Sequence, residues 1–366
     1  MRRLERILLP CLVNYQKVRF ATLVSSLGMT SEPVAKKQHT MPKIGTHNGS
    51  FHCDEVLACY LLKRLDQYTD AEIIRTRDPS LLATTDIVVD VGGVFDPSIH
   101  RYDHHQRSFN ESMNSLNPKL PWTTKLSSAG LVYFHFGRNI ISKMLDLPVD
   151  DTITTTIYDK VYENFIEEID GIDNGIDQYD GEPRYRVSTN LSSRVAGLNP
   201  KWNEKNADEM VQFKKAMQMV GAEFTDRVEY YKLTWLPARQ VVEKAIKGRH
   251  EIDASGQIIC FGDGGAPWKD HLFTIEKELD ISPPITYVLY TDQNGQWRVQ
   301  CVPVSLGSFE NRLSLKEDWR GLRDEELSTK SGIAGCVFVH AGGFIGGNKT
   351  YEGALEMARA SLNSKS

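Results

Sequence analysis

Apolar and polar positions along the chain predict strands and helices in alternation from residue 42 onward. Short apolar runs such as Ile87–Val91 are typical of buried strands, and longer stretches rich in helix-forming residues predict helices. The elements predicted in the first half are strands at 43–46, 73–74, 87–91 and 99–102, and helices at 56–65, 129–145 and 153–169. Such alternation predicts an α/β fold with a mostly parallel sheet flanked by helices.

A polar, irregular stretch at residues 190–206 indicates a domain boundary. The elements predicted beyond it are a long helical region at 207–247, strands at 257–261, 285–291, 297–304 and 336–340, a hairpin turn at 292–295 and a final helix at 351–362. Since 366 residues exceed the usual size of one hydrophobic core, we expect two domains. The first covers residues 42–190. The second, at 191–366, comprises a helical connector and a smaller α+β domain.

Residues 1–41 have a composition of their own. They are rich in Arg, Lys and Leu and contain only two acidic residues, Glu5 and Glu32. A basic, amphipathic, acid-poor leader of this kind is typical of a mitochondrial targeting segment. The alternatives are a disordered tail or an extension upstream of a start at Met29 or Met41.

The overall composition restricts the class of protein. Hydrophobic residues make up 40% and charged residues 25%, as in ordinary globular proteins, and no apolar run is long enough to cross a membrane. The net charge of −5 means that a polyanionic substrate would need a local basic patch. Six scattered cysteines without a C-x-x-C pair argue against a disulfide framework and a zinc ribbon, and favour a reducing compartment.

Histidines and carboxylates gather at predicted strand ends. His47, His52 and Asp54 lie where a strand gives way to a helix, so a loop can turn them toward one point. An ordinary helix start with surface histidines is the alternative. Asp90 interrupts an apolar strand, and a buried carboxylate must be paired or bind a cation. Capping of the turn at Gly92 is its alternative role.

The tripeptide Asp103-His104-His105 strengthens this interpretation. One imidazole can bind a metal while a carboxylate orients its other nitrogen, and the neighbouring imidazole can face the substrate. Asp170 and Asp173 end a predicted helix, where the helix dipole disfavours carboxylates unless a cation is near. Each could also be a plain turn residue. Together these residues predict a binuclear metal site.

A glycine-rich segment near the C-terminus is a candidate substrate site. It is not a P-loop, because Asn348 interrupts the required G-K-[ST] sequence. Its backbone amides and basic residue could bind a phosphate or a terminal nucleotide. The alternative is that the glycines only permit a tight crossing. The candidate residues are His340, Gly342, Gly343, Gly346, Gly347 and Lys349.

A basic stretch at residues 239–250, beside Trp235, is a candidate contact for an RNA strand. Basic side chains can follow the phosphate backbone while an aromatic ring stacks on a base. A solvated helix face is the alternative.

The order of these motifs resembles the DHH phosphoesterase superfamily. Within it, three segments, 45–55, 102–106 and 340–347, look like the melanocyte proliferating gene (MYG) family. The resemblance covers about residues 42–360. It implies a DHH-type fold for residues 42–190, a substrate-binding role for the second domain, and the activity reported for the family, a 3'-to-5' RNA exonuclease of mitochondria and nucleus.

The resemblance also implies a set of ligands. One metal would be held by His47, His52 and Asp90, and His105 would meet the phosphate. The ligands implied for the second metal are Asp54, Asp90, His104 and the acid near the helix end, either Asp173 or Asp170. Most superfamily members have an aspartate where this chain has His52, and imidazole shifts metal preference away from manganese. We expect two divalent ions, manganese first, with zinc, cobalt or iron as alternatives.

The expected function is that of a metal-dependent phosphodiesterase. Its substrate would be single-stranded RNA, its catalytic residues Asp103, His104 and His105, and its location the mitochondrial matrix and the nucleus, with the cytoplasm as an alternative. No membrane partner is expected. Two other functions stay open: hydrolysis of pyrophosphate or small nucleotides, which would need a site ringed by Lys and Arg, and a non-catalytic scaffold whose metal ligands are saturated.

Overall fold

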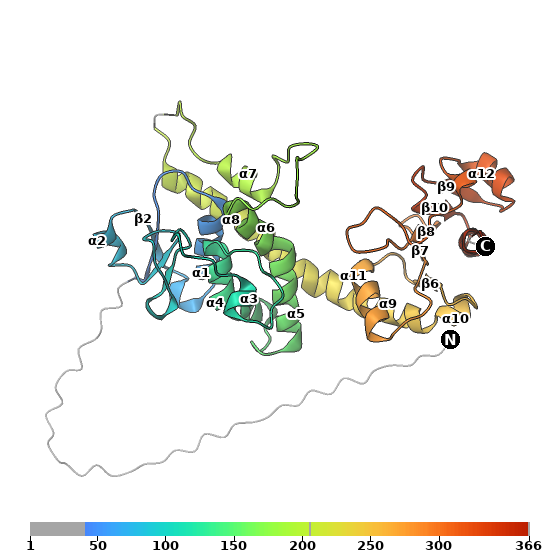
Figure 1. Ribbon diagram of the computed structural model, residues 1–366, viewed down its shortest axis with the longest axis horizontal. Coiled ribbons are helices and arrows are strands. Elements are labelled where there is room, and N and C mark those ends of the chain that lie inside the picture. The colour runs from blue at the N-terminus through green and yellow to red at the C-terminus, as the bar shows by residue number, and fades with distance from the viewer. Residues whose placement is uncertain (1–40, 205, 365–366) are drawn as a thin grey trace, which may run out of the picture. The chain divides into compact units, whose positions relative to one another are not determined.

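The computed structural model describes residues 41–204 and 206–364. The expected targeting segment, apart from Met41, lies outside the described residues. Within the described part the chain forms two five-stranded sheets, which Figure 1 shows with the helices that surround them. In these parts of the chain no helix is long and apolar enough to cross a bilayer.

The first sheet has the strand order β2-β1-β3-β5-β4. Its strands are β1 (Lys43–Thr46), β2 (Glu72–Arg75), β3 (Ile87–Val89), β4 (Phe95–Asp96) and β5 (Arg101–Tyr102). All neighbours pair in parallel except β4, which runs antiparallel to β5. The carboxyl ends of four strands therefore meet at one edge of the sheet, and this edge positions the site described below.

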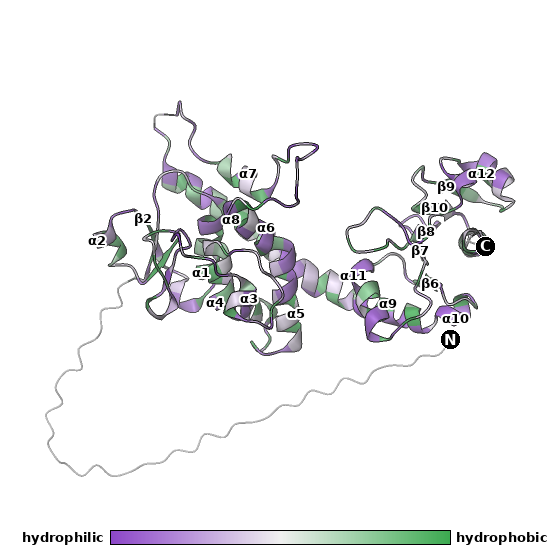
Figure 2. Cartoon of the chain, viewed as in Figure 1, coloured by the Kyte–Doolittle hydropathy of each residue, from purple (hydrophilic) through white to green (hydrophobic). Residues whose placement is uncertain are grey.

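Helices that carry both hydrophobic and hydrophilic residues surround this sheet (Figure 2). They are α1 (Cys53–Leu62), α2 (Pro79–Leu82), α3 (Met113–Leu116), α4 (Ser128–Leu145), α5 (Thr152–Val161), α6 (Glu167–Asp173), α7 (Leu191–Ala196) and α8 (Glu209–Tyr230). The π-helical turn η3 (Tyr162–Ile166) joins α5 to α6. Helix α1 packs against α4 and α8, and its apolar residues are almost fully buried. Burial of this apolar surface is the main stabilising contribution to the first core.

One long helical region takes part in two hydrophobic cores. It consists of α8, the π-helical turn η4 (Tyr231–Trp235) and α9 (Leu236–Lys247). Phe213 and Phe224 of α8 belong to the core of the first sheet. Val242 and Ile246 of α9 belong to a core of the second sheet.

The second sheet is mixed, with the order β6-β7-β8-β10-β9. Its strands are β6 (Ile258–Cys260), β7 (Tyr287–Thr291), β8 (Trp297–Cys301), β9 (Cys336–Val339) and β10 (Ile345–Asn348). Its helices are α10 (Arg249–Ile252), α11 (Lys269–Glu278), α12 (Asp324–Ser331) and α13 (Tyr351–Asn363). Alternate strand residues face α9 and α11 on one side and α12 and α13 on the other, as the period of two in a strand requires.

These observations confirm the predicted fold class, while the domain boundary at residue 190 stays a prediction. One interpretation of the sequence is wrong: Trp235 is only 9% exposed and its ring packs on that of His271, so it cannot stack on an RNA base. In the same basic stretch, Arg239 pairs with Glu278 and Lys247 pairs with Glu243. These side chains form an ordinary solvated helix face.

Candidate metal centre

The carboxyl edge of the first sheet carries the candidate ligands. His47 directly follows β1, Asp90 directly follows β3, and Asp103 and His104 directly follow β5. Because these strands are parallel neighbours, three separate sequence motifs converge on one edge.

The backbone turns sharply at Asp90. Its φ of 58° lies in the left-handed region, which residues with a Cβ atom adopt at a cost. The surrounding structure holds this conformation, since the backbone N–H of Asp90 donates to the carbonyl of Tyr102 at 3.1 Å. The carboxylate of Asp90 is thereby placed between the imidazoles of His47 and His104, in contact with both.

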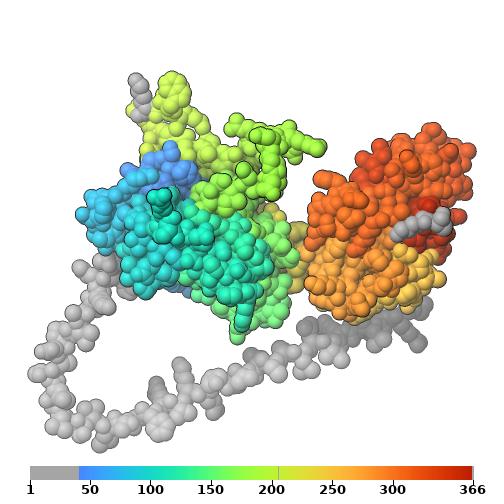
Figure 3. Space-filling view, viewed as in Figure 1, coloured from blue at the N-terminus to red at the C-terminus, as the bar shows by residue number. Residues whose placement is uncertain are grey.

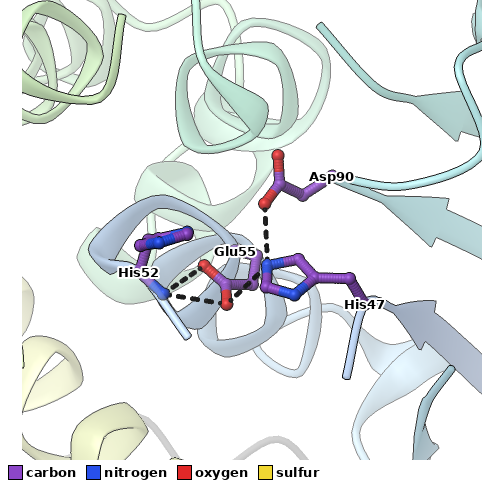
Figure 4. Close-up of side chains that lie close together, drawn as sticks. All are labelled: His47, His52, Glu55 and Asp90. Carbon is purple, nitrogen blue, oxygen red and sulfur yellow. Dashed lines mark hydrogen bonds and ion pairs between the residues drawn. The ribbon is translucent and has the colours of Figure 1, made fainter. Parts of the chain in front are cut away.

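The start of α1 supplies further ligands. His52 is its N-cap, and Asp54 and Glu55 lie in its first turn. The carboxylate of Glu55 accepts hydrogen bonds from the backbone N–H of His52 at 3.0 Å, which caps the helix. The same carboxylate lies 3.1 Å from Nε2 of His47, and that nitrogen lies 3.3 Å from Asp90 (Figure 4).

The loop that carries His47 is held by the last residue of β2. Arg75 donates to the carbonyl oxygens of His47 at 3.2 Å and Gly49 at 2.6 Å. Nδ1 of His47 lies 3.1 Å from the carbonyl oxygen of Asn48, so it acts as the donor there and Nε2 is left for a ligand.

A second group of ligands surrounds His104. Its Nε2 atom lies 3.1 Å from Asp90, 3.2 Å from Asp173 and 3.7 Å from Asp54. The hydroxyl of Ser128 donates at 2.8 Å to Oδ2 of Asp54, the same oxygen that lies 3.7 Å from His104. Three carboxylates thus lie near one imidazole nitrogen. A cation bound beside this nitrogen would be within reach of all three carboxylates.

Asp103 orients His105 rather than His104, where we expected it. Its carboxylate lies 2.8 Å from Nδ1 of His105 and also accepts the backbone N–H groups of His105 and Gly93. The side chain of His105 is 62% exposed, so its Nε2 atom can meet a substrate. The hydrogen bond with Asp103 raises the pKa of His105 and favours a protonated ring.

The charges of this cluster are unbalanced. Asp54 and Glu55 are 0% exposed and Asp90 is 3% exposed, and burial raises the pKa of Glu55 to about 8. Burial by itself lowers the pKa of His47, but hydrogen bonds with Asp90 and Glu55 outweigh it and raise this pKa to about 10. For His104, burial likewise lowers the pKa, and Asp90 and Asp54 raise it to about 9. The buried carboxylates thus favour the protonated, positively charged forms of His47 and His104.

The donor set fits divalent cations. Three groups place one ligand atom from each member within 4.8 Å of one another. The groups are His47, His52, Glu55 and Asp90; then Asp90, His104 and His105; and then His52, Asp54 and Asp173. Asp54 also has a buried oxygen, Oδ1, without a hydrogen-bond partner among the described residues. Mixed imidazole and carboxylate ligands suit manganese, iron, cobalt or zinc.

The two helix-end acids are separated. Asp173 lies among the ligands, whereas Asp170 faces α4, where its carboxylate accepts the backbone N–H and hydroxyl of Ser127 at 2.9 and 2.6 Å. It also accepts from Gly130 and Tyr162. Glu55 is a candidate ligand that the sequence analysis did not name, and its complete burial distinguishes it from an ordinary acidic residue in the first turn of a helix.

A cavity of about 690 Å³ opens onto the cluster. It is lined by His52, Cys53, Asp90, His104, His105, Gln106, Arg107, Lys125, Ile172, Asp173, Asn174, Ser192, Ser193 and Ala196. A volume of this size suits a small organic ligand. The exposed segment 175–189, which projects in yellow-green in Figure 3, connects two parts of this lining.

The glycine-rich segment lies in the second sheet. His340, Gly342 and Gly343 form the turn between β9 and β10, and the backbone N–H of Gly342 donates to Nδ1 of His340 at 3.0 Å. Gly346 and Gly347 lie within β10, where an added Cβ would approach Leu315, Met357 and Arg298. Lys349 follows this strand. The two strand glycines thus permit close packing, and substrate binding by the segment stays a prediction.

Comparison with known proteins identifies the family. The family model described as "Uncharacterised protein family (UPF0160)", which bears the name of the MYG1 exonuclease, matches residues 43–362. The MYG1 exonuclease of Mus musculus is 57% identical over 341 residues, 92% of this chain and 90% of the relative. That of Homo sapiens is 56% identical over 345 residues, 93% and 92% of the two chains.

A solved structure, the pGpG-specific phosphodiesterase of Vibrio cholerae, covers 88% of this chain and 98% of its own, at 16% identity and a TM-score of 0.28. This likeness is too distant to inform the site. The family match and the relatives, in contrast, extend over almost the whole described chain. The chain therefore belongs to the MYG1 exonuclease family (UPF0160), as the resemblance of its motifs led us to expect.

Proposed function

We propose that this protein is a metal-dependent phosphodiesterase that removes nucleotides from the 3' end of single-stranded RNA. The observation that carries the proposal is the buried, unbalanced cluster of carboxylates and histidines at the carboxyl edge of the first sheet. It is open to a cavity, whereas a structural metal site would be closed. The names of the relatives favour an exonuclease within this class.

The three ligand groups would hold two divalent cations, with Asp90 shared by two groups and His52 by two. Such ions neutralise phosphate oxygens and activate water for phosphodiester hydrolysis. The chain's own residues orient the reactants. His105, fixed by Asp103 through Nδ1, leaves its exposed Nε2 atom to meet a phosphate oxygen. Cys53 and Ile172 contribute apolar surface to the cavity.

The test is hydrolysis of a 5'-labelled single-stranded RNA by the purified protein with manganese, cobalt, zinc or iron. We expect stepwise shortening from the 3' end, and no cleavage of a circular RNA of the same sequence. His104→Gln should abolish the reaction, whereas His100→Asn, a change at an exposed histidine outside the ligand groups and the cavity, should leave it intact. Cleavage of the circle would indicate an endonuclease instead.

Two other results would replace the proposal. Phosphate release from pyrophosphate, with RNA left intact, would favour a small-molecule phosphohydrolase. Tight metal binding without turnover of either substrate would favour a scaffold.

We also propose a mitochondrial and nuclear location, on the composition of residues 1–41 and the family resemblance. Imaging of the full chain and of a variant that starts at Met41, each fused to a fluorescent protein, tests it. Mitochondrial signal that persists without residues 1–40 would contradict the targeting role.

A further inference from the structure

The wall of the cavity that faces the ligands contains few permanent cations. Of its lining residues, Arg107 and Lys125 alone are Lys or Arg, while Asp90 and Asp173 contribute negative charge. A phosphate that enters this cavity therefore meets carboxylates unless cations compensate them. Bound metals would compensate the carboxylates at the end of the cavity that contains the ligands. Elsewhere in the cavity, where the rest of an anionic substrate lies, a side-chain cation is needed.

Lys125 is held by its backbone on several sides. It forms an isolated antiparallel bridge with Ser112, and its carbonyl oxygen accepts from Nδ2 of Asn174 at 3.0 Å. Next to it, the hydroxyl of Thr124 donates to Glu167 at 2.8 Å. Asn174, the C-cap of α6, thus holds the backbone of Lys125, and Asn174 directly follows Asp173, one of the candidate ligands.

The side chain of Lys125 is also placed by packing. Its ammonium group lies 5.7 Å from the centre of the Phe109 ring, and that ring contacts His104 edge-on, with ring centres 6.3 Å apart. Phe109 is buried, so it is a fixed support between the lysine and the metal ligand. Over residues 41–204 and 206–364, the structure gives the Lys125 ammonium no carboxylate partner.

We propose that Lys125 binds a phosphate group of the substrate inside this cavity, and so acts as a substrate-binding residue beside the metal ligands. The inference rests on the proposed function and names its phosphate contact. A half-buried, unpaired ammonium on an anchored backbone loses little freedom when it binds an anion. Arg107 is exposed, so its side chain would lose more conformational freedom on binding an anion.

The inference is tested first without turnover. Hydrolysis from the 3' end releases nucleoside 5'-monophosphates, so adenosine 5'-monophosphate is a probe for the phosphate contact. Its binding to the manganese-loaded protein is measured by calorimetry. Lys125→Met keeps an unbranched side chain and removes the charge, and we expect affinity to fall about 10- to 100-fold. Lys125→Arg should retain most of the affinity.

Lys119→Met is the matched control, because Lys119 is an exposed lysine of the same loop that does not line the cavity. It should bind the nucleotide as the unchanged protein does. Unfolding temperatures within a degree or two of the unchanged protein would show that neither variant is misfolded. An affinity of Lys125→Met equal to that of Lys119→Met would overturn the inference.

Kinetics on single-stranded RNA give the second measurement. Lys125→Met should raise KM with kcat changed less than about threefold, since a charge contact binds ground state and transition state alike. The dependence of log KM on log salt concentration should fall by about 0.7, the value for one phosphate contact on a single strand. Unchanged KM and salt dependence would contradict the inference, whereas failure of the unchanged protein to cleave RNA would contradict only the proposed function.

Discussion

Buried carboxylates in the two sheet regions differ in whether their partners balance their charge. In the second sheet's domain, the carboxylate of Glu276 accepts two hydrogen bonds of 2.8 Å from Arg312 and one from the backbone N–H of Ile285. At the edge of the first sheet, Asp54, Glu55 and Asp90 are more deeply buried, and among the described residues their ion-pair partners are histidines.

This difference separates a structural charge from a functional one. Glu276 and Arg312 neutralise each other and need nothing further. The first cluster is neutral only when protons or cations are added, and its cavity lets them in. A buried carboxylate is therefore informative when its partners do not balance its charge, and much less so when they do.

The largest effect is expected from the shared ligand. Asp90→Asn removes a charge while keeping a residue that tolerates the left-handed backbone, so folding should persist. We expect metal-dependent hydrolysis to fall by at least ~100-fold, because Asp90 belongs to two ligand groups. The rate of phosphodiester cleavage measures it. Asp263→Asn, a change at an exposed aspartate, is the control, and equal losses in both variants would contradict a special role for Asp90.

In the second domain, loss of a buried charge partner should change the free energy of unfolding and leave metal affinity unchanged. Arg312→Met leaves Glu276 buried without its cation and should lower the free energy of unfolding by about 3 kcal/mol, as measured in urea. Lys247→Met breaks an exposed pair and should change it by less than about 0.5 kcal/mol. Manganese affinity should be the same in both variants. A marked loss of affinity in Arg312→Met would show that the two regions are not independent.

Cations should stabilise the first cluster. A divalent ion at 100 times its dissociation constant should raise the free energy of unfolding by about 2.7 kcal/mol, and chelation should reverse it. The raised pKa values of His47 and His104, about 10 and about 9, mean that the metal-free protein loses stability as pH rises from about 6.5 through about 10. Metal binding must displace these protons, so affinity should fall as pH drops. Calorimetry in buffers of different ionisation enthalpy measures the number of protons released on metal binding. Release of no protons at pH 7 would contradict this prediction.

The smallest expected effect is the difference in metal affinity between variants of Asp170 and Asp173, the two aspartates at the end of α6. Asp173→Asn should weaken metal affinity, whereas Asp170→Asn should leave affinity within about threefold and lower stability by about 1–2 kcal/mol through its bonds to Ser127, Gly130 and Tyr162. Metal titration and thermal unfolding of the two variants decide between them. The reverse pattern would make Asp170 the ligand.

Much of the fold was predictable because apolar runs are local signals. Strands were predicted at 43–46, 87–91 and 99–102, and parallel pairing brings their ends together. The predicted strand at 87–91 contained Asp90, whereas β3 ends at Val89 and the chain turns at Asp90. Strand β10 was missed, since Gly346 and Gly347 have low strand propensity. They form a strand because the absence of a Cβ lets Leu315 and Arg298 pack against it.

The remaining features of the site depend on orientation, which the sequence does not encode locally. Asp170 and Asp173 are three residues apart on α6, and the packing of that helix on α4 decides which one faces the cluster. Glu55 points inward because it also caps α1. Lys125 comes from a loop far along the chain, and its contacts with Ser112 and Asn174 bring it to the cavity.

The helical region from Glu209 to Lys247 has a consequence for how the protein unfolds and how it can be divided. Phe213 and Val242 lie on one continuous region but in different cores, so separating the halves means cutting inside a helix. A fragment that stops at residue 190 would leave the α1 face that meets α8 open to water, and should aggregate. Heating the intact chain should accordingly give one calorimetric transition, in which both sheets melt together.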